Sequence, residues 1–132
     1  MTNPVGNIKS TGDYRRVFKA IGYSYAGFRH ALRNEAAIRE ELVGLAILVP
    51  VSVFLPVSDL VHLILVLSMM QVVLVEFVNS SIEATVDRIS LERHPLAEQA
   101  KDLASMAVLI AVLMAGLCWV VIAGPVAMRW IR

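Results

Sequence analysis

Two long runs without a charged residue limit what this chain can fold into. Residues 103–123 contain no Asp, Glu, Lys or Arg, and neither do residues 60–75. A helix needs about 20 apolar residues to cross the hydrocarbon core of a bilayer. A third run, residues 42–55, reaches that length only if it extends back through residues 34–41. We therefore expect an all-α membrane protein with three transmembrane helices, at about residues 35–55, 60–90 and 102–123.

The composition agrees with a membrane protein of one domain, residues 1–132. Hydrophobic residues make up 58% of the chain and charged residues 17%, whereas soluble domains carry about 25% charged residues. The net charge of +1 argues against a nucleic-acid partner, since such partners call for a strongly basic surface. The single cysteine, Cys118, excludes a disulfide framework and a cysteine-rich metal site. No cleavable signal peptide is expected, because the first 35 residues lack an apolar segment of the required length.

The region before the first run predicts a surface helix. Residues 1–12 read as a flexible tail, and residues 13–33 as an amphipathic helix in the membrane interface, with apolar side chains recurring every three or four positions. Gly22 and Gly27 predict a break or bend between two short helices there rather than one long helix.

Basic residues predict the orientation in the membrane. Seven precede residues 42–55, three lie between residues 60–75 and 103–123, and none lies between the first two runs. The positive-inside rule then puts the N-terminus in the cytoplasm. The short connection bracketed by Pro56 and Asp59 makes spans one and two antiparallel neighbours. Residues 91–101 read as a polar loop leading into the start of a helix.

A polar stripe interrupts the second span. Glu76, Asn79, Glu83 and Asp87 lie at offsets of 0, 3, 7 and 11 residues, which is one face of a helix that turns about 100° per residue. Polar residues inside a membrane helix are costly, usually face the interior of a bundle and are usually functional. For some of these residues the alternative to a functional role is a structural one, in which hydrogen bonds between helices support trimer or dimer assembly.

Paired carboxylates predict a cation site at the cytoplasmic side. Glu35 begins the first span and Glu83 lies toward the end of the second, so the two meet if those helices are neighbours. Carboxylates without His or Cys suit Mg²⁺, which usually shares its coordination between one or two carboxylates and phosphate oxygens. Lys101 and Arg16 can contribute positive charge to a polyphosphate. Asp102 positions Lys101 or caps the third span.

Glu76 lies about 10 Å from Glu83 along the same helix, at seven residues of 1.5 Å each. Its position at the lipid boundary suits a general base for an alcohol whose tail lies in the membrane. The alcohol would lose its proton to Glu76 and attack a terminal phosphoryl group, with Asn79 orienting either partner. The side-chain pattern alone predicts ordinary solvent-exposed surface positions, without a catalytic role, for Glu40, Glu92, Glu98 and His94.

Four motifs resemble a known family. Residues 76–87, E-F-V-N-S-S-I-E-A-T-V-D, resemble the E-x-x-N-[ST]-[AS]-I-E-x-x-V-D signature of the prokaryotic diacylglycerol kinases. The motifs A-I-G-Y-S (20–24), N-E-A-A-I-R (34–39) and A-K-D-L-A-S (100–105) match its other blocks in the same order. The similarity covers about residues 14–119.

The resemblance implies an integral-membrane kinase of the bacterial inner membrane, a homotrimer with active sites shared between subunits. It implies that MgATP phosphorylates diacylglycerol to phosphatidic acid. By motif position Glu76 is the catalytic base, supported by Asn79, while Glu35 and Glu83 bind the metal and ATP. The other nucleotide-contacting positions are Arg16, Tyr23, Glu92, Arg93, His94, Lys101 and Asp102. The lipid-substrate positions are Arg16, Glu41, Glu76 and Ser105, and Asp87 supports the site.

The chain departs from the family pattern at three places. Tyr25 and Ala26 replace an interfacial Trp and a Lys, Glu40 stands where Gln is frequent, and Pro95 stands where Glu is common. Two alternative functions stay open at this point. One is an undecaprenol kinase, which shares the site. The other is a non-enzymatic subunit that conducts ions or protons along the stripe, although no ionisable residues continue such a path through the other spans.

Overall fold

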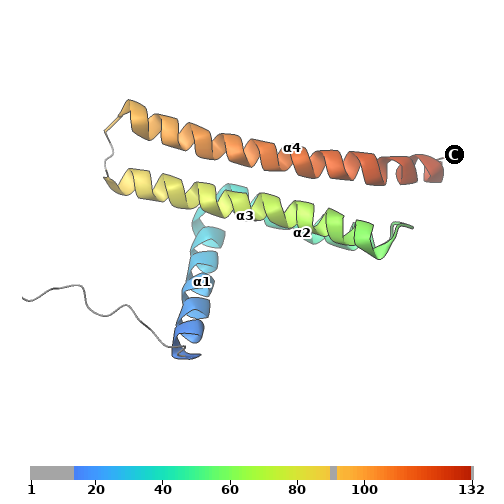
Figure 1. Cartoon of the computed structure of the whole chain (residues 1–132), viewed down its shortest axis with the longest axis horizontal. Helices are drawn as coiled ribbons and strands as arrows, with labels where there is room; N and C mark the ends of the chain where they lie inside the picture. The colour runs from blue at the N-terminus through green and yellow to red at the C-terminus, as the bar shows by residue number, and fades with distance from the viewer. Residues whose placement is uncertain (1–13, 90–91, 132) are drawn as a thin grey trace, which may run out of the picture. The chain divides into compact units, whose positions relative to one another are not determined.

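A computed structural model of the chain describes residues 14–89 and 92–131. Within these ranges the protein is built from helices and contains no strand, which confirms the all-α prediction. The predicted tail, residues 1–12, lies outside the described residues, as does the end of the second span at Ser90. Figure 1 shows the four helices, α1 (Tyr14–Asn34), α2 (Ala36–Val53), α3 (Asp59–Ile89) and α4 (Pro95–Ile131).

The chain divides into two compact units, residues 1–34 and residues 35–132. In the first unit α1 is one continuous helix of 21 residues, so the predicted break at Gly22 and Gly27 is wrong. A glycine inside a helix costs about 1 kcal/mol relative to alanine, and here that cost is too small to interrupt the helix. A Cβ atom at either position would meet nothing within 4 Å, so no close neighbour requires the glycines.

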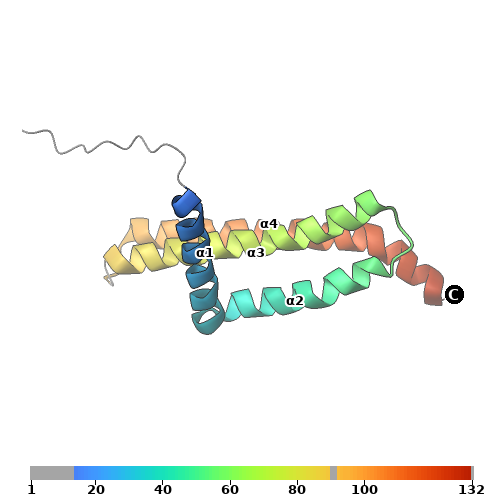
Figure 2. The same cartoon turned by 90° about the horizontal axis from the view of Figure 1, so that it is seen from below.

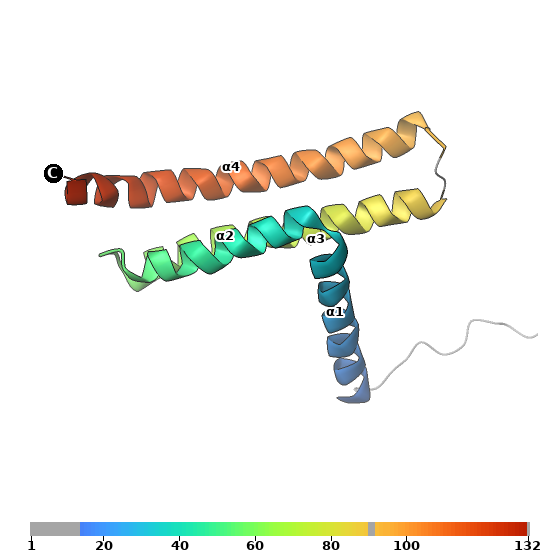
Figure 3. The ribbon, with the colours of Figure 1, turned by 180° about the vertical axis from the view of Figure 1, so that it is seen from behind.

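In the second unit α3 packs against both α2 and α4. α2 and α3 form the expected antiparallel pair, joined by a short turn, and α4 runs back along α3 (Figures 2 and 3). Helical hydrogen bonding closes the turn on each side. The N–H of Leu55 donates to the carbonyl of Ser52, and the N–H of His62 donates to the carbonyl of Ser58. The helix that carries the polar stripe, α3, therefore has two neighbours, α2 and α4.

α3 and α4 are long and apolar enough to cross a membrane, with mean hydropathies of 2.2 and 2.7 over their most apolar stretches. The 31 residues of α3 measure roughly 46 Å at 1.5 Å per residue, which exceeds a hydrocarbon core of about 30 Å. α2 has only 18 residues, and Arg39, Glu40 and Glu41 are among them. Because of its length and these charges, α2 as the first transmembrane helix stays a prediction.

α4 begins earlier than predicted, because residues 95–101 are helical rather than part of a loop. Pro95 is the first residue of the helix, a position where proline is favoured because its missing N–H would have no partner in any case. The ring Nδ1 of His94 accepts a hydrogen bond of 3.2 Å from the N–H of Leu96. His94 therefore caps the helix that Pro95 starts.

Small residues bring α4 close to α3. Ala111 and Ala115 are buried with Val72, and Met69 and Val75 pack around them. Ala104 is buried too, whereas Ala107 and Gly116 are exposed. Only some of the small residues of α4 therefore take part in this contact.

Replacing Ala111 with leucine is expected to destabilise the α3–α4 pair by about 1–3 kcal/mol through overpacking. Ala111 is 2% exposed and has no room for three more carbon atoms beside Val72. Ala107→Leu is the matched control, because Ala107 is exposed on the same helix. Unfolding of both variants in mixed detergent micelles, followed by circular dichroism, measures the difference. Equal stability of the two variants would contradict this packing.

Candidate active site

The polar stripe of α3 becomes more exposed along its length. Glu76 is 6% exposed and Asn79 is 8% exposed, Glu83 is half-buried and Asp87 is exposed. Glu76 stands 17 residues after Asp59, which is roughly 26 Å along a helix and close to the thickness of a hydrocarbon core.

Asn79 connects the two carboxylates of the stripe that flank it. Its Nδ2 donates a hydrogen bond of 3.3 Å to Oε1 of Glu83, and its side chain also hydrogen-bonds Glu76. Its Oδ1 is buried and has no hydrogen-bond partner among the described residues. Asn79 thus interacts with both Glu76 and Glu83.

α2 adds two carboxylates to this cluster. The carboxylate of Glu35, at the start of α2, interacts electrostatically with Glu76, and so does Glu41, one and a half turns further along. Glu41 is half-buried, and its Oε2 is a buried atom without a hydrogen-bond partner in the described part of the chain. Three carboxylates, Glu35 and Glu41 from α2 and Glu83 from α3, therefore interact with Glu76. We call this set, Glu35, Glu41, Glu76 and Glu83 with Asn79, the carboxylate cluster.

The chemistry of the carboxylate cluster fits a hard divalent cation. Like charges this close repel one another, and a cation among them relieves the repulsion. In residues 14–89 and 92–131 no group of three His, Cys, Asp or Glu side chains is placed to hold a metal ion. Mg²⁺ in a nucleotide complex usually takes one or two protein carboxylates, while phosphate oxygens and waters fill its other positions.

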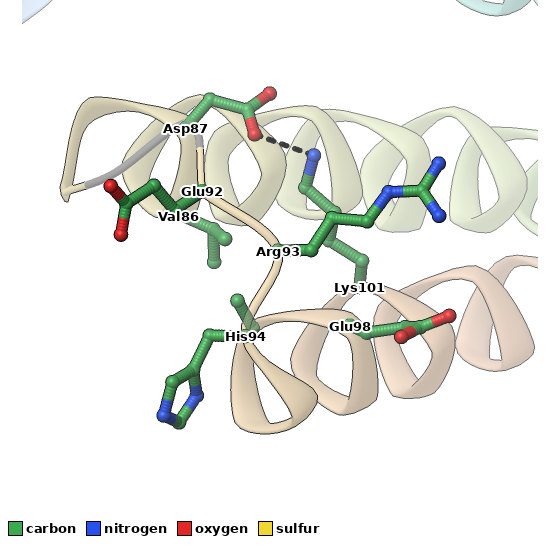
Figure 4. A pocket seen from close by; sticks show the side chains of 8 residues that line it. Val86, Asp87, Glu92, Arg93, His94, Glu98 and Lys101 are labelled. Carbon is green, nitrogen blue, oxygen red and sulfur yellow. Dashed lines mark hydrogen bonds and ion pairs between the residues drawn. The ribbon is translucent and has the colours of Figure 1, made fainter.

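A second polar group lies where α3 ends and α4 begins. Nζ of Lys101 on α4 forms an ion pair of 2.6 Å with Oδ1 of Asp87 on α3. The pair borders a pocket of about 280 Å³, whose polar lining also includes Glu92, Arg93, His94 and Glu98. Figure 4 shows Lys101 reaching toward Asp87, while Glu92 and His94 point away from the pair. We call this the loop pocket. Asp87 stands one turn after Glu83, so α3 connects the loop pocket to the carboxylate cluster.

The remaining predicted residues lie at less enclosed positions. Asp102 and Ser105 are exposed on α4. Arg16 and Tyr23 are exposed on α1, which belongs to the other unit, so their part in the site stays a prediction.

Two residues belong to the loop pocket or the carboxylate cluster although the side-chain patterns did not indicate them. Glu98, interpreted as ordinary surface, lines the loop pocket. Its spacing of three residues before Lys101 on a helix was the available signal. Glu41, assigned only through the family resemblance, interacts with Glu76.

The fold and the site together define a small all-α membrane protein with a partly buried carboxylate cluster suited to a cation and a polyphosphate. Residues 22–123 match the model of the family described as prokaryotic diacylglycerol kinase. The chain is 43% identical over 113 residues to the diacylglycerol kinase of Escherichia coli K12, which covers 86% of this chain and 93% of the relative.

Two further relatives have the same description. The diacylglycerol kinase of Pseudomonas aeruginosa is 43% identical over 82% of this chain and 88% of its own length. The diacylglycerol kinase of Helicobacter pylori 26695 is 38% identical over 80% of this chain and 83% of its own length. The chain belongs to the prokaryotic diacylglycerol kinase family and is a kinase, as its four motifs predicted.

Proposed function

We propose that this protein phosphorylates diacylglycerol with MgATP to give phosphatidic acid in the bacterial inner membrane. The observation that carries the proposal is the buried Glu76 beside Glu35 and Glu83, with Asn79 between the two α3 carboxylates. The names of the related proteins identify diacylglycerol as the alcohol that accepts the phosphoryl group. The buried carboxylate supplies the base such an acceptor needs.

Glu76 acts on the acceptor hydroxyl. Its carboxylate takes the proton while the hydroxyl oxygen attacks the γ-phosphorus of ATP. A new P–O bond forms to the lipid, the bond from the γ-phosphorus to the bridging oxygen breaks, and ADP leaves with that electron pair. Asn79 orients Glu76 for this transfer through its hydrogen bonds. Burial of both side chains keeps water, a competing acceptor, away from the phosphoryl group.

Glu35 and Glu83 would hold Mg²⁺, which neutralises charge on the terminal phosphates and makes the γ-phosphorus a better electrophile. Lys101 contributes further positive charge from the loop pocket. It is paired with Asp87, but the pair is partly exposed, and such pairs contribute only about 0–1 kcal/mol. Lys101 can therefore exchange Asp87 for a phosphate oxygen at little cost.

The other predicted contacts complete the proposal. Nucleotide contacts are assigned to Arg16, Tyr23, Glu92, Arg93, His94 and Asp102, and lipid contacts to Glu41 and Ser105, with Arg16 shared. The protein acts as a homotrimer with three transmembrane helices per subunit, the surface helix and the N-terminus on the cytoplasmic side, and sites shared between subunits.

Phosphoryl transfer from radiolabelled ATP is expected with diacylglycerol in mixed micelles and is expected to be far weaker with undecaprenol. The expectation rests on the relatives, which are all diacylglycerol kinases. Thin-layer chromatography of the labelled lipid identifies the product for each alcohol. Preferential labelling of undecaprenol would reassign the substrate, and labelling of neither lipid would contradict the proposed function.

A further inference from the structure

One face of α3 is left uncovered by α2 and α4. Six residues on this face are exposed and follow one another at alternating steps of four and three positions: Leu60, Ile64, Leu67, Gln71, Leu74 and Val78. The five apolar members are between 41% and 66% exposed. We call this set the heptad stripe. The buried residues of α3, among them Leu65, Val72 and Glu76, lie on another side of the helix.

The spacing of the heptad stripe matches the contact surface of a second helix. Helices that pack side by side in parallel repeat their contacts every seven residues, at two positions named a and d. Ile64, Gln71 and Val78 occupy the a positions, and the three leucines occupy the d positions. β-branched residues at a with leucine at d are typical of parallel helices, whereas acyl chains impose no such repeat.

Gln71 is a polar side chain inside the apolar part of α3. It stands 12 residues after Asp59, which is roughly 18 Å along the helix and past the middle of a hydrocarbon core of about 30 Å. Among the described residues its one hydrogen-bonding contact is weak, because Nε2 lies 4.0 Å from Sδ of Met114 on α4 and a thioether sulfur is a weak acceptor. Acyl chains offer a carboxamide no hydrogen bond, so Gln71 calls for a polar partner outside its own subunit.

We propose that the heptad stripes of neighbouring copies of this chain pack against one another, and that their Gln71 carboxamides hydrogen-bond to each other inside the membrane. Copies inserted with the same orientation lie parallel, so each residue of the stripe meets the same residue of its neighbour at the same depth. A carboxamide is self-complementary, because its NH₂ group donates and its oxygen accepts. A polar residue at an a position, paired in this way, fixes the register between the helices.

This contact rests on the proposed homotrimer and names the surface that builds it. None of the six residues of the heptad stripe belongs to the carboxylate cluster, and the buried Glu76 and Asn79 lie on another side of α3. Association between copies can therefore be measured without turnover. A protein without kinase activity would leave this contact standing, and the absence of this contact would leave the chemistry of the carboxylate cluster standing.

Disulfide cross-linking of the full-length protein in lipid vesicles tests which face of α3 the copies share. In a Cys118→Ala background, Leu67→Cys or Leu74→Cys supplies a single thiol, which is oxidised with copper phenanthroline. Covalent dimers are expected at both positions of the stripe. Val66→Cys and Val73→Cys are the matched controls, because each lies one residue earlier on the same helix and off the stripe, and they are expected to stay monomeric on denaturing gels.

Equal cross-linking at the stripe and control positions would overturn the proposal, because it would show random collision. No cross-linking at any of the four positions would overturn it too, because lipid would then cover the stripe.

Gln71→Leu is expected to weaken the association between copies by about 3- to 30-fold, the range for one side-chain hydrogen bond between membrane helices. Energy transfer between copies labelled at the N-terminus, across a series of dilutions into detergent and lipid, measures the change. Gln71→Asn keeps a carboxamide and is expected to retain most of the association. Met114→Leu is the matched control, because it removes only the contact within the subunit, and it is expected to associate normally.

Normal association of the Gln71→Leu protein would contradict the hydrogen bond between copies. A loss of the same size in the Met114→Leu protein would assign the role of Gln71 to its own subunit and overturn the proposal, and an asparagine variant as weak as the leucine variant would do the same.

Discussion

Glu76→Gln is expected to lower kcat for phosphorylation of diacylglycerol by about 10²- to 10⁴-fold, the usual contribution of a general base. Glutamine has the same shape and keeps a partner for Asn79, but its amide cannot accept the proton of the hydroxyl. Glu76 is 6% exposed, so no water chain from solvent easily replaces it. Initial rates in mixed micelles at saturating MgATP measure the loss directly.

Glu40→Gln is the matched control for this experiment. Glu40 is exposed on α2, next to Glu41, and loses the same charge on substitution. It is expected to keep nearly normal turnover. A Glu76→Gln protein with the same kcat as the Glu40→Gln control would remove Glu76 as the base.

Glu83→Gln is expected to lower kcat/KM for MgATP by at least about 100-fold, since metal coordination contributes several kcal/mol to phosphoryl transfer. The substitution removes one of the two proposed carboxylate ligands while leaving Asn79 a hydrogen-bonding partner at that position. Raising free Mg²⁺ is expected to recover part of the activity, because the remaining ligands bind the ion more weakly. Steady-state kinetics across a series of Mg²⁺ concentrations measures both effects. An unchanged Mg²⁺ requirement with a large loss of rate would contradict the metal role.

The polar stripe could be predicted in full from the sequence, because helical periodicity alone puts Glu76, Asn79, Glu83 and Asp87 on one face. Their order along the helix axis could be predicted too, since each residue adds a fixed 1.5 Å. Their exposure rises in the same direction, from 6% at Glu76 to an exposed Asp87. Local geometry was sufficient for this part of the site.

Contacts between helices could not be predicted in the same way. The approach of Glu41 to Glu76 depends on how α2 docks along α3, which no spacing within either helix specifies. The Asp87–Lys101 pair likewise joins residues 14 positions apart across the end of two helices. The family resemblance suggested roles for these residues, but only packing shows their partners.

The two incorrect predictions, a break in α1 and a loop before α4, gave too much weight to the conformational preferences of individual residues. Gly22 and Gly27 predicted a break, yet the other residues of α1 support one helix through both. Polar residues up to Lys101 predicted a loop before a helix start at residue 102, but with a proline at its first position and the His94 cap, α4 begins seven residues earlier. In α1 the cost of the two glycines was smaller than the gain from continuing the helix, and in α4 the proline stands at a position that favours a helix start.

The central claim is that one stripe on α3 performs two tasks, proton removal at Glu76 and metal–nucleotide binding at Glu83. The most direct test is the affinity for MgATP of both glutamine variants, measured by isothermal titration calorimetry on protein in the same nanodiscs. Glu76→Gln is expected to bind MgATP as the original protein does, and Glu83→Gln is expected to bind it at least tenfold more weakly. Equal affinities in the two variants, whether both normal or both reduced, would contradict the division of the stripe.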